Sequence, residues 1–476
     1  MKRRITSVLR SATLVCVVCS AFGASGVYAQ DQQQEENAKP KPAAHAPLID
    51  ANEQDTSTDP NALTPDTSPL TGIQTPGLGS VEFRHSYWVP GVQVANTVQS
   101  GGNGGSWFDT TYLAGNLSLS EAWAHSHLTL NYSGGGYFST GNEGNGTYQQ
   151  LGFVQGFTWR RWQLQFFDDF AYLPTSQFGF GGLSGIAGPG VSGSLSPVSP
   201  LLNGIYLPNQ TVLLANGPRY SNSFAAQANF AVSPRGSITL IGSYGLLRFT
   251  TPGNIDNDDE IGSIGYNYAV TKNDSVGVLY RFTAYHFTGQ PQAIGDHTFN
   301  LAYGRKITGR LGLSLSAGPE IITFRVPVGT ITQQTNLSLG ASLTYGLERG
   351  NISLGYSHGT NGGSGVLAGA TGDIIDATAT RHITRVWAAR ANFGYGREHA
   401  FAAVGALAAA SYNNYYFGVG LDRPIGRNSF LSLGYTAYIV NTNVAACGIS
   451  LCSPGTSTQH QLAVGYQWHT RPFVLR

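Results

Sequence analysis

Residues 259–287, DEIGSIGYNYAVTKNDSVGVLYRFTAYHF, decide the fold, because large apolar side chains alternate with small or polar ones on both sides of a short polar turn. Before the turn, the large residues take every second position: Ile264, Tyr266, Tyr268 and Val270. A period of two is typical of a β-strand with two different faces. The stretch therefore predicts a hairpin of two long strands.

The second strand of this hairpin keeps the alternation, with Val276, Val278, Tyr280 and Phe282 on one face. The other face carries small or polar residues, with Leu279 as the exception. A soluble sheet could not build a core from such a face. The pattern fits an inverted arrangement, in which the apolar face meets lipid and the polar face lines the wet interior of a closed barrel.

The composition agrees with that inversion. The chain has 476 residues, of which 11% are charged, whereas about 25% are charged in a typical soluble protein. Glycine contributes 62 residues and aromatic side chains make up 11%. The 27 basic and 26 acidic residues leave no basic footprint, so we expect no nucleic-acid partner.

Residues 1–29 have the features of a secretory signal peptide: a basic start, an apolar centre, and Val27 and Ala29 in a small-residue cleavage pattern. Cys16 and Cys19 lie inside this leader, and each follows a valine where a lipid-attachment site needs a small residue. We therefore expect both cysteines to be removed with the leader and not acylated.

Residues 30–80 are dominated by Gln, Glu, Asn, Pro, Thr and Asp, which predicts a disordered periplasmic tail. No later apolar run reaches eighteen residues. The longest, 400–410, is too short to cross a bilayer as a helix and contains Gly405. We therefore expect strands, and no helix, to cross the membrane.

From residue 81 to residue 476, alternating segments are separated by two kinds of connection. Eight are short turns, at 120–126, 160–161, 233–236, 271–274, 308–310, 348–350, 384–385 and 425–427. Nine are longer and rich in Gly, Asn, Ser and Pro, near 99–106, 139–147, 174–221, 251–258, 288–294, 326–334, 359–372, 397–411 and 442–457. The parse predicts one all-β, closed, antiparallel, up-and-down transmembrane barrel of about 18 strands, with a range of 16–20.

This pattern resembles the outer-membrane β-barrel class of Gram-negative bacteria, and within it the porin-like proteins. The resemblance covers residues 81–476 as an order of strands and loops, without a diagnostic motif. It implies an outer-membrane location with both termini periplasmic, contact with outer-membrane lipid, insertion by the outer-membrane assembly machinery, and passive diffusion of small solutes. One departure is the last strand, where Phe473 comes three residues before the end and no aromatic residue closes the chain.

The resemblance also implies a role for residues 174–221, the third long loop, because in many porins this loop folds into the lumen and sets the constriction. Its many apolar residues among Gly, Ser and Pro favour the same placement, and a surface flap is the alternative. General porins carry acidic residues on this loop, whereas here Arg219 is the only charge. The constriction candidates are Phe178, Phe180, Tyr206 and Arg219.

Strand parity gives the candidates for the pore lining: Asp169, Arg281, Glu320, Arg390 and Asn392. We expect the charged ones to face inward, because an Arg or Lys at the lipid midplane costs about 2–4 kcal/mol. They could select a solute or simply pair with one another across strands.

Asp168 directly precedes Asp169, so in a regular strand one of the two must face lipid. A position at the rim of the barrel, or a bulge, would avoid that cost. We expect this end of the strand to lie at the rim.

Cys447 and Cys452 are the cysteines that remain after the leader, and they face an oxidising compartment. They predict a disulfide in the last outer loop. A metal site and two free thiols are the alternatives, although two thiolates alone make a poor metal site.

No catalytic constellation, metal site or cofactor motif emerges. Ser357 and His358 are neighbours, and His125 and His127 stand two apart, but neither pair has a recognisable third partner. A passive channel is therefore favoured over a structural or adhesion barrel with a filled lumen, and over a barrel enzyme. The sequence leaves open which solute passes and whether the barrel is a monomer or a homo-oligomer.

Overall fold

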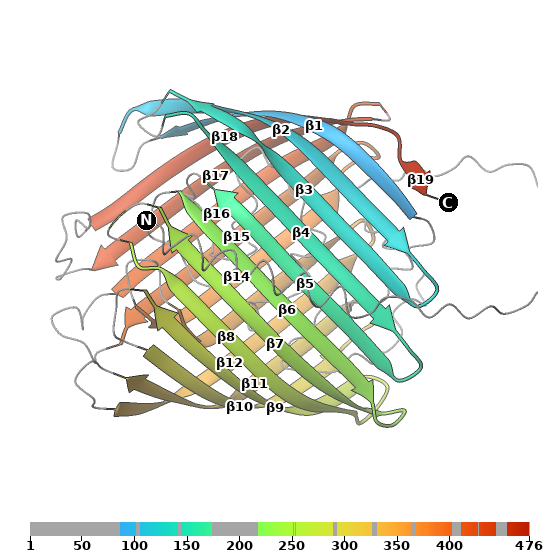
Figure 1. The fold of residues 1–476 in the computed structure, drawn as a ribbon, viewed down its shortest axis with the longest axis vertical. Helices are drawn as coiled ribbons and strands as arrows, with labels where there is room; N and C mark the ends of the chain where they lie inside the picture. The colour runs from blue at the N-terminus through green and yellow to red at the C-terminus, as the bar shows by residue number, and fades with distance from the viewer. Residues whose placement is uncertain are drawn as a thin grey trace, which may run out of the picture. The chain divides into compact units, whose positions relative to one another are not determined.

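The computed structural model describes residues 86–100, 105–140, 144–173, 218–250, 252, 254–288, 293–325, 331–362, 368–401, 411–426, 428–443 and 455–475. Within these residues, tilted antiparallel strands follow one another around a ring (Figure 1). No helix among them is long and apolar enough to cross a membrane.

Eighteen strands make up the wall and one short strand follows them. The strands are β1 (Ser86–Ser100), β2 (Trp107–Ala122), β3 (Ser126–Ser139), β4 (Gly146–Thr158), β5 (Trp162–Leu173), β6 (Arg219–Ala231), β7 (Gly236–Phe249), β8 (Asn257–Ala269), β9 (Asp274–Phe287), β10 (Ala293–Lys306), β11 (Leu311–Arg325), β12 (Ile331–Leu347), β13 (Gly350–Asn361), β14 (Ala370–His382), β15 (Ala388–Ala400), β16 (Ser411–Pro424), β17 (Ser429–Asn443), β18 (Gly455–His469) and β19 (Phe473–Leu475).

The ring is closed by the first and last long strands. β1 pairs with β18 over nine residues, from Gly91 opposite His469 to Gln99 opposite Gln461, and every other strand pairs with its neighbours in sequence. Closure leaves no strand edge at the ends of the sheet. The predicted closed barrel of about 18 strands is confirmed, and all eight predicted turns lie between the strands that they were expected to join.

Pro90 explains the extra strand β19. Proline has no N–H to give to a ladder, and the partner of β1 changes at this point, from β18 on one side to β19 on the other. Phe473 of β19 stacks on Trp88, with ring centroids 4.8 Å apart. β19 and the short turns lie at the same end of the barrel (Figure 1).

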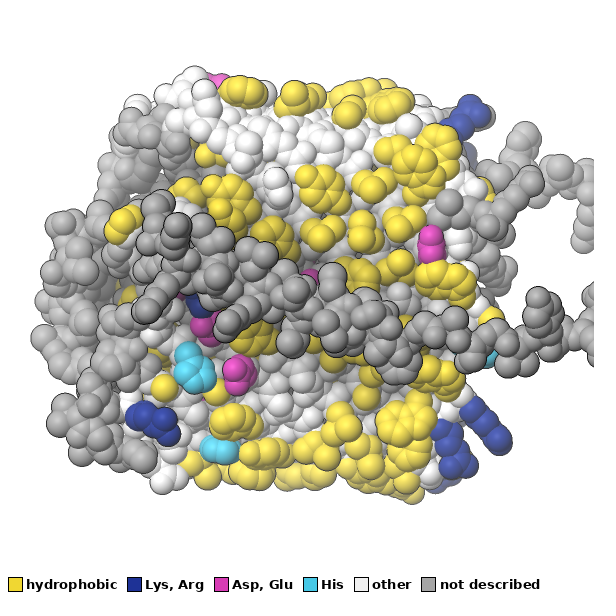
Figure 2. All heavy atoms as spheres, viewed as in Figure 1, with side chains coloured by type: hydrophobic (Ala, Val, Ile, Leu, Met, Phe, Trp, Pro, Cys, Tyr) yellow, Lys and Arg dark blue, Asp and Glu magenta, His cyan; other side chains and the backbone are white. Residues whose placement is uncertain are grey.

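The two faces of the wall differ as the alternation predicts. Large apolar side chains point outward and are exposed, as for Leu301 at 69% and Val278 at 52%. Their neighbours Asn300 and Leu279 point inward and are buried. Figure 2 shows the apolar side chains spread over the outer surface, with Lys and Arg gathered toward the two ends.

The depth of the apolar belt follows from counting residues from the end of each strand that adjoins a short turn. In the described strands, outward Asp, Glu, Lys, Arg and His side chains lie within the first two residues, as Arg305 and Arg423 do, or at the ninth residue and beyond, as His358 and Arg397 do. At about 3.3 Å per residue and a tilt of roughly 45°, the steps from the second to the ninth residue span about 16 Å along the membrane normal. Asp168 is the exception, at the seventh residue of β5.

Candidate solute pathway

The five pore-lining candidates all lie on the inner face. Arg281, Glu320 and Asp169 belong to β9, β11 and β5, and Arg390 and Asn392 belong to β15. Each alternates with outward residues of its strand, such as Phe282, which is exposed while Arg281 is buried.

Arg281 is held by the neighbouring strand β10. Its Nη2 lies 3.5 Å from the carboxylate of Asp296 and donates to Thr298 Oγ1 at 3.1 Å. Thr298 in turn donates to Asp296 at 3.1 Å. All three side chains are buried, so the guanidinium is fixed against the wall and does not project into open lumen.

Arg390 is paired in a similar way, with its Nη2 3.4 Å from Asp422 on β16. Gly420 makes room for this arrangement, because a Cβ there would lie 2.6 Å from Arg390 Nε. Asn392 donates to the hydroxyl of Tyr416 on the same strand pair, at 2.7 Å. Pairing across strands, one of the two roles expected for these residues, is therefore present.

The end of β13 remote from the short turns leaves the plane of the wall. Its ladder with β12 ends where Leu339 pairs with His358, although both strands continue beyond this point. The N–H of Thr360 donates instead to Oε1 of Glu320 on β11, at 3.0 Å. The hydroxyl of Tyr285 on β9 donates to the carbonyl of Thr360 at 3.2 Å. These contacts bring the end of β13 inward, toward β9.

A second carboxylate anchors the same segment. Glu398 on β15 accepts a hydrogen bond from the side-chain amide of Asn361 at 3.3 Å. Both Glu320 and Glu398 are fully buried. The end of β13 at Thr360 and Asn361 is thus held from both sides, by β11 and by β15, each two strands away.

An apolar cluster fills the inner face at this end of the barrel. Its buried members are Tyr285, Phe287, Ile294, Ile322, Phe324 and Phe401. Phe401, the residue after β15, packs edge-on against Phe324 with ring centroids 4.7 Å apart. Ala368, just before β14, packs against the same cluster. The barrel thus contains a small core inside the end remote from the short turns, contributed partly by Ala368 and Phe401, which lie outside the strands.

This cluster was not predicted, although the sequence contains two signals for it. The first is that Ile294, Ile322 and Phe324 are apolar at inward positions, at the ends of strands remote from the short turns. The second is the apolar character of the predicted loop 397–411, to which Phe401 belongs. Apolar residues on both the wall and a loop indicate that the loop packs inside.

The expectation that Asp168 and Asp169 lie at the rim is wrong. Residues 163–172 of β5 pair without a break with both β4 and β6, so no bulge occurs and the parity holds. Asp169 faces inward and Asp168 faces outward in the middle of the strand. There Asp168 accepts a hydrogen bond from Asn222 Nδ2 on β6 at 2.8 Å.

The inner face carries more acidic than basic side chains. Away from the turns, the described strands place three arginines inward, Arg219, Arg281 and Arg390. They place seven carboxylates inward: Asp169, Asp259, Asp296, Glu320, Asp376, Glu398 and Asp422. Over the described strands, away from the turns, the inner face therefore carries an excess of acidic side chains.

Several expectations fall outside the described residues: the signal peptide 1–29, the tail 30–80, most of loop 174–221 with Phe178, Phe180 and Tyr206, and the cysteines Cys447 and Cys452. Arg219 is described as the first residue of β6, inward and buried. Within the described part of the chain, no group of three or more His, Cys, Asp or Glu side chains is arranged to hold a metal ion.

Comparisons with known proteins give distant similarities. No protein-family model matches the chain, and neither does any curated protein. The outer membrane protein OpdK of Pseudomonas aeruginosa aligns over 81% of this chain and 99% of its own, with 10% identity and a TM-score of 0.42. OccK2 (OpdF) of the same organism aligns over 80% and 98%, with 9% identity and a TM-score of 0.42. A BenF-like porin of Pseudomonas fluorescens Pf-5 aligns over 82% and 99%, with 10% identity and a TM-score of 0.41.

Sequence identities and TM-scores this low carry no argument about function. The strand pairing itself establishes the barrel fold, and any function has to be argued from the residues of the wall and its interior.

Proposed function

We propose that this chain is an outer-membrane channel through which small solutes diffuse passively. The observation that carries the proposal is the closed ring of eighteen strands, apolar outside and polar inside. Such a ring is stable only where its outer face meets lipid. Its circumference is too wide for the side chains of the strands alone to fill.

The location and orientation follow from the same features. A chain with the features of a signal peptide and no long apolar run can cross an inner membrane and insert as strands into an outer one. Short turns on one side and long connections on the other are typical of barrels whose turns face the periplasm. In this orientation both ends of the barrel are periplasmic, and insertion uses the outer-membrane assembly machinery.

The channel is narrowed at its outer mouth. The end of β13, anchored by Glu320 and Glu398, takes up part of the opening, and Phe401 adds to it. We assign a second contribution to residues 174–221, whose apolar composition fits the lumen better than water. The expected solutes are neutral or cationic and small, because the inner wall carries seven carboxylates and three arginines away from the turns of the described strands.

A structural or adhesion barrel with a filled lumen is the alternative, and the apolar cluster inside the mouth is the observation that favours it. An enzymatic role has less support. Ser357 faces inward on β13 whereas His358 faces outward and contacts Asp373 at 2.7 Å, so the two neighbours lie on opposite sides of the wall.

Single-channel recording of the purified full-length chain in planar bilayers tests the proposal. Stepwise conductance in salt, together with entry of small neutral solutes into liposomes that contain the protein, is the expected result. A folded, inserted barrel that shows no conductance would instead favour the filled lumen.

A further inference from the structure

Two carboxyl groups lie next to each other in a buried part of the inner wall, beside the apolar cluster. Asp296 on β10 and Glu320 on β11 both face inward, and both are fully buried. In the ladder between these strands, Glu320 is opposite Thr298, two residues along β10 from Asp296. The two carboxyl groups are close enough to hydrogen-bond to each other. Such a bond requires a proton, because two carboxylates offer only acceptors.

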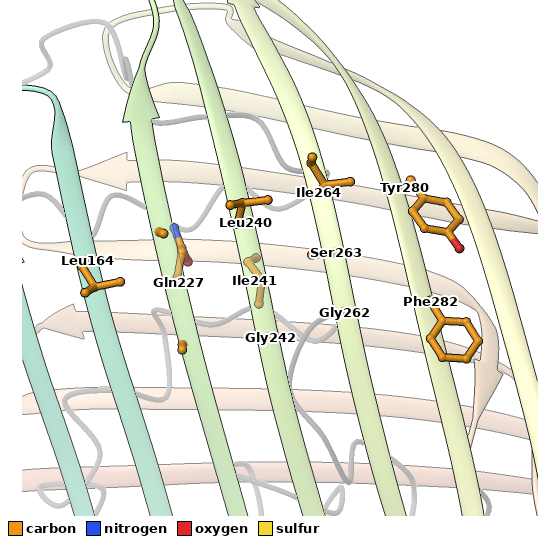
Figure 3. Close-up of a pocket in the computed structure, with 12 residues that line it drawn as sticks. Leu164, Gln227, Leu240, Ile241, Gly242, Gly262, Ser263, Ile264, Tyr280 and Phe282 are labelled. Carbon is orange, nitrogen blue, oxygen red and sulfur yellow. The ribbon is translucent and has the colours of Figure 1, made fainter. Parts of the chain in front are cut away.

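One arginine faces this carboxyl pair. Arg281 on β9 is buried and lies 3.5 Å from Asp296. Its neighbours Tyr280 and Phe282 line a groove on the outer face of the wall (Figure 3), so the guanidinium between them is on the lumen side. A single arginine neutralises only one of two carboxylates. Because a second negative charge is costly where water is excluded, the pair is more stable with one proton than with none.

The other groups around the pair supply no second positive charge. Asp259 on β8 and the hydroxyl of Tyr285 on β9 face the same site, and a carboxylate at Asp259 adds to the negative charge. The inward positions of β12 and β13 hold no ionisable side chain. Gly359 of β13 passes close by, since a Cβ there would lie 3.5 Å from Oε1 of Glu320. Among the described residues, Arg281 is therefore the only cation of this site.

The carboxyl pair is connected to the mouth of the barrel through Glu320, whose Oε1 accepts from the N–H of Thr360 at 3.0 Å. Asp296 is held in place by Arg281 and by a hydrogen bond from Thr298. Without the shared proton, two carboxylates would face each other where water is excluded, and they would repel each other strongly. Glu320 is the partner that can move, and its movement away from Asp296 breaks its contact with Thr360.

We propose that Asp296 and Glu320 share one proton, and that its loss at alkaline pH releases the end of β13 and widens the channel. The proton leaves to the water of the lumen. At acidic pH the carboxyl group of Glu320 keeps an oxygen that accepts from Thr360, so the end of β13 stays in place. The widening rests on the proposed channel function, whereas the shared proton does not.

Single-channel recording of the full-length chain from about pH 5 to about pH 9 tests the release, because a shared buried proton is lost within this range. The unmodified channel should have larger and noisier conductance at the alkaline end. Asp296→Asn and Glu320→Gln each place an amide donor where the proton was, so both should lose the pH dependence and keep the acidic-pH conductance. Asp376→Asn, which removes a different inward carboxyl group on β14, is the matched control and should keep the pH dependence.

A channel that conducts equally at all these pH values, or whose pH dependence survives in both amide variants, overturns the proposed release and leaves the channel function intact.

Infrared spectroscopy of the folded barrel tests the proton without any conductance, because the C=O stretch of a protonated carboxyl group differs from that of a carboxylate. The unmodified chain and Asp376→Asn should lose a protonated-carboxyl band between neutral and alkaline pH. Asp296→Asn and Glu320→Gln should lack that band. If the amide variants show the same spectral change as the unmodified chain, the pair holds no proton and the proposal is overturned. A barrel that shows the band but never conducts would refute the channel function and, with it, the widening.

Discussion

The N–H of Thr360 donates to the carboxylate of Glu320 at 3.0 Å, although the two residues lie on β13 and β11, with β12 between them. The carboxylate thus replaces the ladder that β12 stops providing after Leu339. Removing it leaves a backbone donor without an acceptor, which costs about 1–3 kcal/mol when the donor is buried.

Glu320→Ala should therefore loosen the outer end of β13. We expect larger and noisier single-channel conductance with the barrel still inserted. Glu348→Ala, at an exposed turn where Glu348 pairs with Arg310, is the control and should conduct like the unmodified chain. A Glu320→Ala channel with unchanged conductance and noise would mean that this anchor does not restrict the pore.

The acidic inner wall predicts a preference for cations. In a salt gradient across a planar bilayer, the reversal potential should indicate higher permeability for potassium than for chloride. Asp169→Asn and Asp376→Asn each remove one inward charge, and neither aspartate forms an ion pair among the described residues. Each substitution should lower the preference, and the double variant should lower it further. An anion-selective unmodified channel would contradict the charge argument.

The orientation of the wall can be tested at Leu301, the most exposed of the large outward apolar side chains on the described strands. Leu301→Arg should reduce the free energy of unfolding in lipid by roughly 2–4 kcal/mol, because it places a cation near the middle of the bilayer. Leu301→Ala controls for the lost apolar area. Denaturant titration of the barrel in liposomes measures both, and equal stabilities would argue against a lipid-facing position.

The long loop predicts a change in pore size. Deleting residues 180–210, with the flanking strands kept, should raise the conductance several-fold if the loop narrows the lumen. A deletion of similar length within the tail 30–80 is the control for shortening the chain. Unchanged conductance and selectivity would place the loop outside the pore.

Cys447 and Cys452 should be joined by a disulfide in the protein isolated from the outer membrane. Closing so short a loop stabilises the fold little, because a cross-link removes less conformational entropy from the unfolded chain when the loop that it closes is short. Mass spectrometry of an unreduced digest should find the two cysteine peptides linked. Detection of both thiols after alkylation would rule the bridge out.

The wall could be predicted from the sequence because the alternation of residues within each strand determines locally which side chains face outward. The alternation in residues 259–287 fixes which side chains face lipid, and a shift by one residue would turn every apolar side chain inward. The same local rule placed Arg281 and Glu320 on the inner face. The polar turns between strands set the strand count in the same local way.

The contacts across the lumen could not be predicted in this way. Thr360 meets Tyr285 and Glu320 through a bend that no alternation records, and Phe401 joins a cluster whose other members lie far away in the chain. Asp168 shows the opposite problem. Its outward position followed from parity, but the cost of a charge in lipid led to the wrong expectation of a rim position.

The pairing of β1 with β18 has a consequence for how the protein is made. Gly91 lies opposite His469 and Gln99 lies opposite Gln461, so the contacts that close the ring join residues more than 360 positions apart. Contacts of such long sequence separation form slowly, because loop closure costs entropy before the contact stabilises anything. Until the last strand arrives, β1 offers an unpaired edge that other chains can join. Ring closure should therefore be the late, rate-limiting step of biogenesis, and a chain cut short before β18 should aggregate or be degraded instead of inserting.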